Sequence, residues 1–130
     1  MEHGRKYGVI VAVQNHNDFI QTAEQTISII NKVNSEWFGI VLDTGSFVTN
    51  EPYSEIAKIA PYAVNWQIKE KLTYKDKSEN IDLEKLFHII KASPYRGYLP
   101  IETLGAGDPF MIIPPFLKHV IETMEKVMSG

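Results

Sequence analysis

The sequence predicts an α/β protein built on a parallel sheet, and three observations favour this class. Short apolar runs of strand length alternate with longer segments whose apolar residues recur every three or four positions. No two strand-like runs are separated by a hairpin turn signal, so we expect a helix after each strand. Strands joined through a helix run parallel, with right-handed crossovers. The 130 residues, of which 44% are hydrophobic, are enough for a single domain over residues 1–130.

The first expected strand covers residues 7–13 (YGVIVAV), a continuous and largely β-branched run that is typical of a strand buried on both faces. A helix follows from Thr22, because Thr22 and Gln25 have the spacing of a capping box. The apolar stripe of this helix consists of Ala23, Ile27, Ile30 and Val33. Residues 37–42 (WFGIVL) are the second expected strand.

The middle of the chain predicts a short helix, a strand and a loop. Pro52 suits the first turn of a helix, since its missing N–H would be unpaired there in any case. The inward residues of that helix are Ile56, Ile59 and Ala60. Residues 62–68 (YAVNWQI) are the third expected strand, and the polar residues 69–80 (KEKLTYKDKSEN) are expected to form one long loop.

The last third of the chain completes the alternation. Asp82 is the expected N-cap of a helix with the stripe Leu83, Leu86, Phe87 and Ile90. Residues 97–101 (GYLPI) are a short fourth strand, weakened by Pro100, which cannot donate a ladder hydrogen bond. A final helix over residues 114–128 has an apolar face of Leu117, Val120, Ile121, Met124 and Met128. Two architectures share this pattern, a small doubly wound open sheet and a piece of an α/β barrel.

Charge and composition exclude several classes of function. The chain has 13 Lys and Arg against 16 Asp and Glu, a net charge of −3, which argues against a binder of nucleic acid or of anionic membranes. Without cysteine, a disulfide framework, a thiol nucleophile and a thiolate metal site are impossible. The first residues lack the apolar core of a secretory signal, and no apolar run approaches the roughly 20 residues that cross a bilayer. We therefore expect a cytoplasmic protein with no membrane segment.

Polar side chains stand at the ends of the expected strands, one on each strand. These residues are Gln14, Asp43, Gln67 and Glu102. Ligands of parallel sheets bind beyond the carboxyl ends of the strands, in both architectures. Four oxygen donors brought together there could hold Mg²⁺ or Mn²⁺, or could bind a polyhydroxylated substrate.

Each of these residues also fits a structural role. Asp43 precedes Thr44 and Gly45, so it could cap a turn. Glu102 could pair with Lys69, and the two glutamines could satisfy backbone groups of the loops. His16 stands in a strongly polar loop, where a binding role competes with a hydrogen bond that only stabilises the loop.

Four segments, VAVQNHND, VLDTGSF, PYAVNWQIKE and YRGYLPIETLG, resemble the xylose isomerase-like TIM-barrel superfamily in sequence and in order. This superfamily contains sugar isomerases and epimerases, and the resemblance covers nearly the whole chain. It implies the barrel architecture, of which the four βα units resemble the last half. A (βα)4 half-barrel exposes two sheet edges, and we expect homodimerisation to complete it.

The resemblance also implies roles for the strand-end residues. Members of the superfamily typically bind one divalent metal through a Glu, an Asp, a His and a Glu, and these positions are Gln14, Asp43, Gln67 and Glu102 here. Asn15, His16 and Lys69 match positions that line the substrate pocket. A glutamine cannot accept a proton, so Gln14 puts a two-carboxylate epimerisation in doubt, and both glutamines weaken the expected Mg²⁺ or Mn²⁺ site.

Two hypotheses about function follow from these residues. The first is a metal-assisted proton shift on a sugar or sugar phosphate, with Glu102 as the base. The second is a catalytically inactive half-barrel that serves as a carbohydrate-binding or assembly module.

Overall fold

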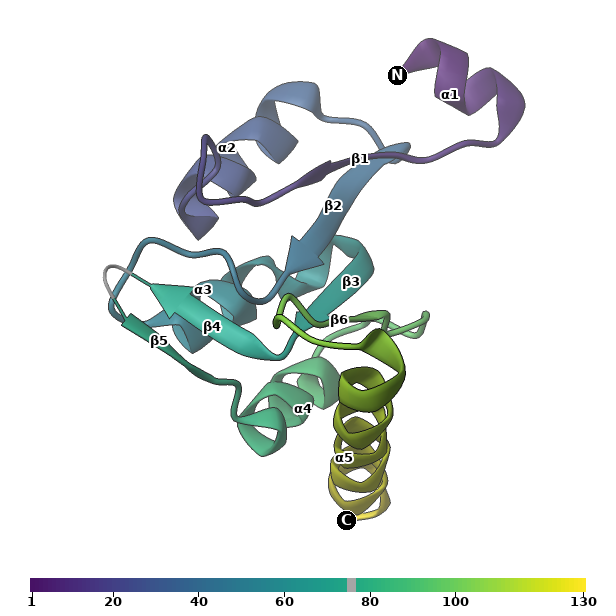
Figure 1. Ribbon diagram of the computed structural model, residues 1–130. Helices are drawn as coiled ribbons and strands as arrows, with labels where there is room; N and C mark the ends of the chain where they lie inside the picture. Colours follow the sequence, from purple (N-terminus) through teal and green to yellow (C-terminus); the bar gives the residue numbers. More distant parts are fainter. Residues whose placement is uncertain (75–76) are drawn as a thin grey trace.

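A four-stranded parallel sheet forms the centre of the molecule. The structure, a computed structural model, describes residues 1–74 and 77–130 (Figure 1). The strands lie in the order β1, β2, β3, β6, and every neighbouring pair is parallel. Their bounds are β1 (Val11–Gln14), β2 (Phe38–Asp43), β3 (Ala63–Lys69) and β6 (Ile101–Glu102). The α/β class and the parallel sheet predicted from the sequence are confirmed.

Helices follow the strands and cover one face of the sheet. The bounds are α2 (Ala23–Val33), α3 (Pro52–Ile59) with the short 3₁₀ turn η1 (Ala60–Tyr62), α4 (Leu83–Ala92) and α5 (Pro109–Ser129). Each of these helices packs on the next, α2 on α3, α3 on α4 and α4 on α5. A doubly wound sheet would place helices on both faces. The strand order and the single row of helices are therefore those of half a barrel.

The two predicted helix caps at Thr22 and Asp82 are present. The Thr22 hydroxyl accepts a hydrogen bond from the Gln25 N–H, and the Gln25 side chain accepts one from the Thr22 N–H, so the capping box is complete. The Asp82 carboxylate accepts a hydrogen bond from the Lys85 N–H at 3.0 Å. Both caps pair N–H groups that the first helical turn leaves without partners.

The hydrophobic core lies between the sheet and the helices. Every second residue of β2 and β3 points into it, and Ile40, Leu42, Trp66 and Ile68 are fully buried there. The helices contribute Ile56, Ile59, Leu86, Phe87 and Ile90. The intervening residues of the same strands point to the opposite face, which is the inner face of the half-barrel.

The expectation of one long loop over residues 69–80 is wrong. An antiparallel hairpin forms there from β4 (Lys71–Tyr74) and β5 (Lys77–Asn80). Leu72 is buried, whereas the neighbouring Lys71 and Thr73 are exposed. β4 therefore alternates with period two, whereas all four residues of β5 are exposed, and the many charged residues of the interval conceal the pattern.

The expectation of a fully buried first strand is also wrong. β1 begins only at Val11, and residues 2–7 form the short helix α1 (Glu2–Tyr7), which lies apart from the rest of the molecule (Figure 1). Val9, Ile10 and Val11 are exposed. β1 is an edge strand that pairs with β2 alone, and nothing among the described residues covers its other side.

The last helix, α5, begins five residues earlier than expected, at Pro109, with Asp108 as its cap. Phe116, Val120 and Val127 are its buried residues. Leu117 and Ile121, which the sequence places on the inward face, are about 40% exposed, at 42% and 41%. α5 therefore has a second apolar strip that no described part of the chain covers.

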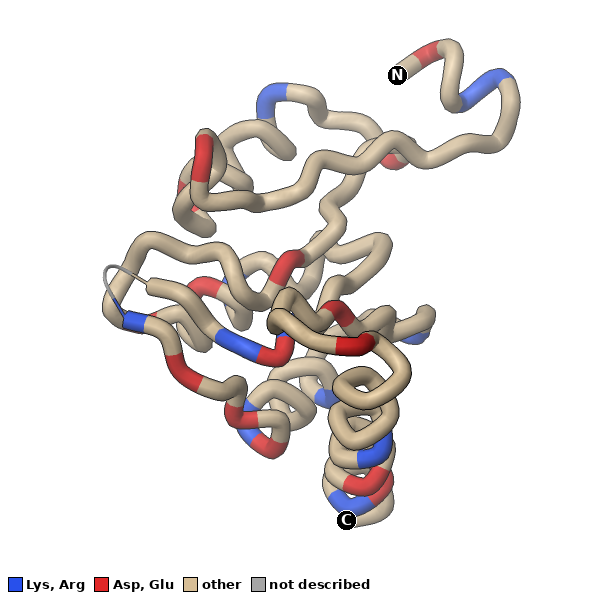
Figure 2. The backbone as a smooth tube through the Cα atoms, in the orientation of Figure 1, with Lys and Arg blue, Asp and Glu red and all other residues tan. Residues whose placement is uncertain are grey.

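None of the helices in residues 1–74 and 77–130 is both long and apolar enough to cross a membrane. Basic and acidic residues are interspersed along the backbone, as Figure 2 shows. The charges are therefore dispersed over the molecule.

Candidate functional site

The register of the sheet places five polar residues on the inner face of the half-barrel. Asp43 lies opposite Gln67 in the pairing of β2 with β3, and Lys69 lies opposite Glu102 in the pairing of β3 with β6. Gln67 and Lys69 are two residues apart on β3, so they share a face. Gln14, at the end of β1, is the fifth. The strand-end residues predicted from the sequence are thus in direct contact, together with Lys69. We refer to these five residues as the polar cluster.

Asp43 is fully buried, and its carboxylate has partners on both oxygens. Oδ1 accepts a hydrogen bond from the Gly45 N–H at 2.9 Å, which is the turn cap considered for this residue. Oδ2 accepts one from Gln14 Nε2 at 3.0 Å and lies 3.4 Å from Lys69 Nζ. Asp43 therefore caps the turn after β2 and also belongs to the polar cluster.

The two glutamines form a chain of hydrogen bonds across the sheet. Gln14 Nε2 donates to Gln67 Oε1 at 2.7 Å as well as to Asp43. Gln67 Nε2 in turn donates to Glu102 Oε2. The amides thus act as donors toward both carboxylates and pair with side chains rather than with loop backbone.

Lys69 lies between the two acidic residues of the cluster. Its Nζ donates to Glu102 Oε2 and lies within ion-pair distance of Asp43. The side chain is only 10% exposed, whereas that of Glu102 is 28% exposed. The pairing of Glu102 with Lys69 that the sequence suggested is present, and it joins a larger network.

Backbone and side-chain contacts fix the strand ends that carry the cluster. The Thr44 hydroxyl donates to the Gln67 carbonyl oxygen at 3.2 Å and accepts from the Lys69 N–H at 2.9 Å. The Asn15 side chain is buried, donates to the Asp43 carbonyl oxygen at 2.8 Å and accepts from the Asp43 N–H at 2.9 Å. Asn15, expected to contact the substrate, thus holds β1 to β2.

A cavity of about 260 Å³ opens beside the cluster, and both Lys69 and Glu102 line it. Its other walls come from the loop after β1, the loop after β2, the hairpin β4–β5 and the loop after β6. The lining residues outside the cluster are His16, Asn17, Gly45, Ser46, Glu70, Lys71, Thr73, Ser78, Leu104 and Gly105. Asp43, Gln14, Gln67 and the neighbouring Asn15 are not part of the wall.

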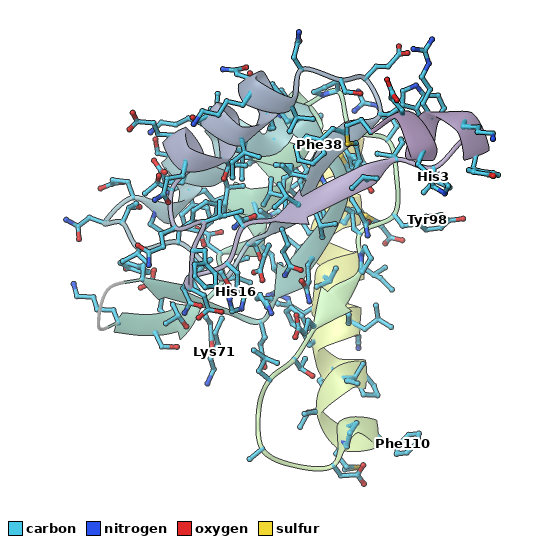
Figure 3. All side chains as sticks on the ribbon, turned by 90° about the horizontal axis from the view of Figure 1, so that it is seen from above. His3, His16, Phe38, Lys71, Tyr98 and Phe110 are labelled. Carbon is cyan, nitrogen blue, oxygen red and sulfur yellow. The ribbon has the colours of Figure 1, made fainter. Side chains whose placement is uncertain are left out.

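His16 and Lys71 both line this cavity, and Figure 3 labels both of them on the side of the hairpin. The ring Nδ1 of His16 lies 3.0 Å from Asp18 Oδ2, and the backbone N–H of His16 donates to the Ile20 carbonyl oxygen. The imidazole therefore stabilises its loop and also borders the cavity, so both roles weighed for it are compatible with its position.

Sequence reasoning missed Lys71, Thr73 and Ser78, the hairpin residues of the cavity wall. The signal that could have found them is the polar–apolar alternation around Leu72, which predicts a half-buried strand. A parallel bridge between Ser46 and Thr73 ties the hairpin to the loop after β2. The hairpin is thus fixed against the mouth of the cavity.

The polar cluster, as arranged, does not fit the divalent metal that the resemblance implies. Within residues 1–74 and 77–130 no three His, Asp or Glu side chains converge as a metal-binding group. The amides direct N–H groups, not carbonyl oxygens, at the two carboxylates, and Lys69 stands between those carboxylates. Two carboxylates are the only charged oxygen ligands in the cluster.

Two solved structures share the fold of the chain. A xylose isomerase domain protein from Planctomyces limnophilus superposes with a TM-score of 0.79 at 17% identity, over 99% of this chain and 50% of that one. The 3-keto-D-glucoside 4-epimerase of E. coli, in its apo form, superposes with a TM-score of 0.65 at 14% identity, over 99% and 49%. This chain thus spans about half the length of the structures that it matches. No curated protein matches it in sequence.

The family assignment rests on a sequence model that covers nearly the whole chain. The model that describes the xylose isomerase-like TIM barrel matches residues 1–126. Its barrel architecture agrees with the sequential parallel strands and the single row of helices. The chain belongs to the xylose isomerase-like TIM barrel family.

Proposed function

We propose that this chain binds a hydroxy-carbonyl sugar in the 260 Å³ cavity and shifts a proton within it, with Glu102 as the base. One observation carries the proposal. Glu102 is the carboxylate of the polar cluster that reaches the cavity, and its Oε2 is held by Gln67 and Lys69. A carboxylate fixed in this way presents Oε1 to a bound molecule in one orientation.

One base is enough for this proton shift, because the same carboxylate can remove the proton and return it. The Glu102 carboxylate accepts the proton from the carbon beside the carbonyl, and the C–H electron pair moves to form an enediolate whose charge lies on the carbonyl oxygen. Lys69 and His16, both in the cavity wall, can donate hydrogen bonds to the oxygens of the substrate. The proton of the neighbouring hydroxyl group passes to the former carbonyl oxygen, so the negative charge moves to the other oxygen, where the new carbonyl forms. Glu102 then returns its proton to the former carbonyl carbon on the same face.

The residues of the cluster favour isomerisation over epimerisation. Inversion at a carbon needs a second proton carrier on the opposite face, and the position that supplies it in the resemblance is Gln14. An amide does not accept a proton at any useful pH. No step is assigned to Mg²⁺ or Mn²⁺, because the arrangement of Asp43, Glu102 and the two amides does not fit such an ion.

The test is proton exchange followed by ¹H NMR in D₂O. A panel of aldoses, ketoses and their phosphates is incubated with the protein, and loss of the signal from the carbon beside the carbonyl is measured. We expect Glu102→Gln to reduce exchange by roughly 10²-fold or more, since it removes the proton acceptor. The matched control is Glu24→Gln, an exposed residue of α2, which is expected to exchange at the wild-type rate. Equal exchange by wild type and Glu102→Gln rules this mechanism out.

A second candidate function is an inactive half-barrel that binds carbohydrate or assembles with other chains. The observation that favours it is that Gln14 and Gln67 stand where the resemblance implies a Glu and a His as metal ligands. It predicts chemical-shift changes at residues of the cavity on addition of a sugar, without any proton exchange. The same NMR samples therefore distinguish the two candidates.

We also propose a homodimer, as the sequence led us to expect. β1 and β6 are the edges of the sheet, with exposed apolar residues beside β1 and on α5. In a barrel the helix after each strand covers the groove toward the next strand. Among the described residues α5 is followed by no strand, so its open strip can cover β1 of a second copy. The cytoplasmic location expected from the sequence stays a prediction.

A further inference from the structure

We propose that Lys69 is a built-in cation that takes the place of a divalent metal between Asp43 and Glu102. The polar cluster would then bind an uncharged hydroxy-carbonyl ligand without a metal, and it would bind Mn²⁺ or Mg²⁺ only when the ammonium is removed. This inference goes beyond the proposed function, because it stands whether or not the bound sugar reacts.

The geometry supports the replacement directly. Lys69 Nζ contacts Glu102 Oε2 and lies 3.4 Å from Asp43 Oδ2, so the ammonium occupies the space between the two carboxylates. An ion that bound both groups would need oxygen ligands at about 2.1 Å for Mg²⁺, within that same space. A metal and the Lys69 ammonium therefore exclude each other.

The sum of charges in the cluster leads to the same conclusion. Asp43 and Glu102 together carry two negative charges when ionised, which one divalent ion would balance. With Lys69 present the net charge is −1, and a divalent ion would leave an excess of positive charge in a largely buried place. The penalty for such an excess is large in a site of low polarity.

The orientation of the amides is a third, separate observation. Gln14 and Gln67 turn their NH₂ groups toward Asp43 and Glu102, which uses lone pairs of both carboxylates. Ligands of a metal would have to turn their oxygens inward instead. Lys69 has three donors, of which one is donated to Glu102, while Asp43 lies at ion-pair distance and the side chain lines the cavity, where a free donor can meet a ligand. Such a donor suits the carbonyl or hydroxyl oxygen of a sugar.

The test is binding of Mn²⁺, measured from the EPR signal of the free ion with the purified full chain. Wild type is expected to show no site tighter than about 1 mM. Lys69→Met, which keeps an unbranched side chain as far as Cε and removes the ammonium, is expected to gain one site per chain, at least about tenfold tighter than in wild type. The matched control is Lys71→Met, an exposed lysine of the same cavity, which is expected to gain none.

Three results would overturn the inference. They are a stoichiometric Mn²⁺ site in wild type, no gain in Lys69→Met, and an equal gain in Lys71→Met. If Lys69→Met is unfolded because Asp43 is left without its cation, refolding with Mn²⁺ becomes the measurement. Recovery of the helical circular dichroism with Mn²⁺ supports the inference, and no recovery overturns it.

Discussion

Asp43 holds a negative charge in a fully buried position, and the groups around it stabilise that charge. The Gly45 N–H and Gln14 donate to it, and Lys69 lies at ion-pair distance. A buried carboxylate without such partners would be strongly destabilising. The same contacts bring the loop after β2 and the side chain of Lys69 close together, and Gly45 is the residue that permits this.

Gly45→Ala is therefore expected to destabilise the protein. An added Cβ would lie 2.5 Å from Lys69 Cγ and 2.8 Å from the carbonyl oxygen of Lys71, so both β3 and the hairpin would have to move. We expect a loss of roughly 1–3 kcal/mol in the free energy of unfolding, measured in urea. Gly105→Ala is the control, because a Cβ there meets no atom within 4 Å. Equal stability of Gly45→Ala and wild type would show that this contact is looser than described.

The sequence predicts which residues lie at the candidate site, but it does not predict all of their contacts. The positions of Gln14, Asp43, Gln67 and Glu102 followed from the ends of parallel strands, which meet at one edge of the sheet. The inward position of Lys69 also follows from the two-residue period of β3. Its place between the two carboxylates depends on rotamers and on the register of β6, which sequence patterns do not determine.

At the scale of elements, α2 and α3 are joined by the carboxylate of Glu55 on α3. Its Oε2 accepts the N–H of Ala23, the first residue of α2, at 2.6 Å, and its Oε1 accepts from Lys58 Nζ at 2.7 Å. Burial raises the pKa of Glu55, but the hydrogen bonds from Lys58 and Ala23 and the charge of Lys58 outweigh it and leave the pKa below its usual value of 4.5. The ionised form therefore stabilises the contact of the two helices.

Glu55→Gln is expected to lower the free energy of unfolding by about 1–2 kcal/mol at pH 7. Because the folded pKa is lowered, this contribution is present above pH 4.5 and is lost as the pH falls through the folded pKa. The difference between wild type and Glu55→Gln should shrink between pH 5 and pH 3, roughly, in urea unfolding. Glu84→Gln, on the exposed side of α4, is the control and should stay within roughly 0.5 kcal/mol of wild type. A difference for Glu55→Gln that is constant with pH would contradict this account.

The elements also differ in how well sequence patterns predict them. α2 and α4 have both a cap residue and a regular apolar stripe, and the structure places their starts where Thr22 and Asp82 predict them. The hairpin was missed because its strands have only four residues each and are mostly charged or polar, so hydrophobic periodicity is weak. The first strand was expected to be buried because Val9, Ile10 and Val11 are apolar, and burial of such a run depends on a neighbour outside the described sheet.

At the scale of the whole molecule, apolar surface remains open at both ends of the sheet. Val9, Ile10 and Val11 lie beside the first edge, and Leu117 and Ile121 lie on the last helix. The matched structures have about twice the length of this chain. Open sheet edges and apolar strips of this kind favour association with another copy.

Light scattering should therefore give a solution mass of twice the 14.8 kDa of one chain. Ile121→Asp places a charge in the open strip of α5 and is expected to produce the monomer with unchanged circular dichroism. Ser28→Asp, on the exposed side of α2, is the control and should remain a dimer. A wild-type monomer of 14.8 kDa would disprove the homodimer.

Lys69 is covalently part of β3, so the cation of the polar cluster stays in place when the metal content of the surroundings changes. A cation that belongs to the polypeptide cannot be chelated, exchanged for a competing ion or lost by dilution. The balance of charge around Asp43 and Glu102 is then set when the chain folds, and it is the same whether the supply of metal is scarce or abundant. Exposure to EDTA or to an excess of zinc should leave the hydrogen bonds and ion pairs of the polar cluster unchanged.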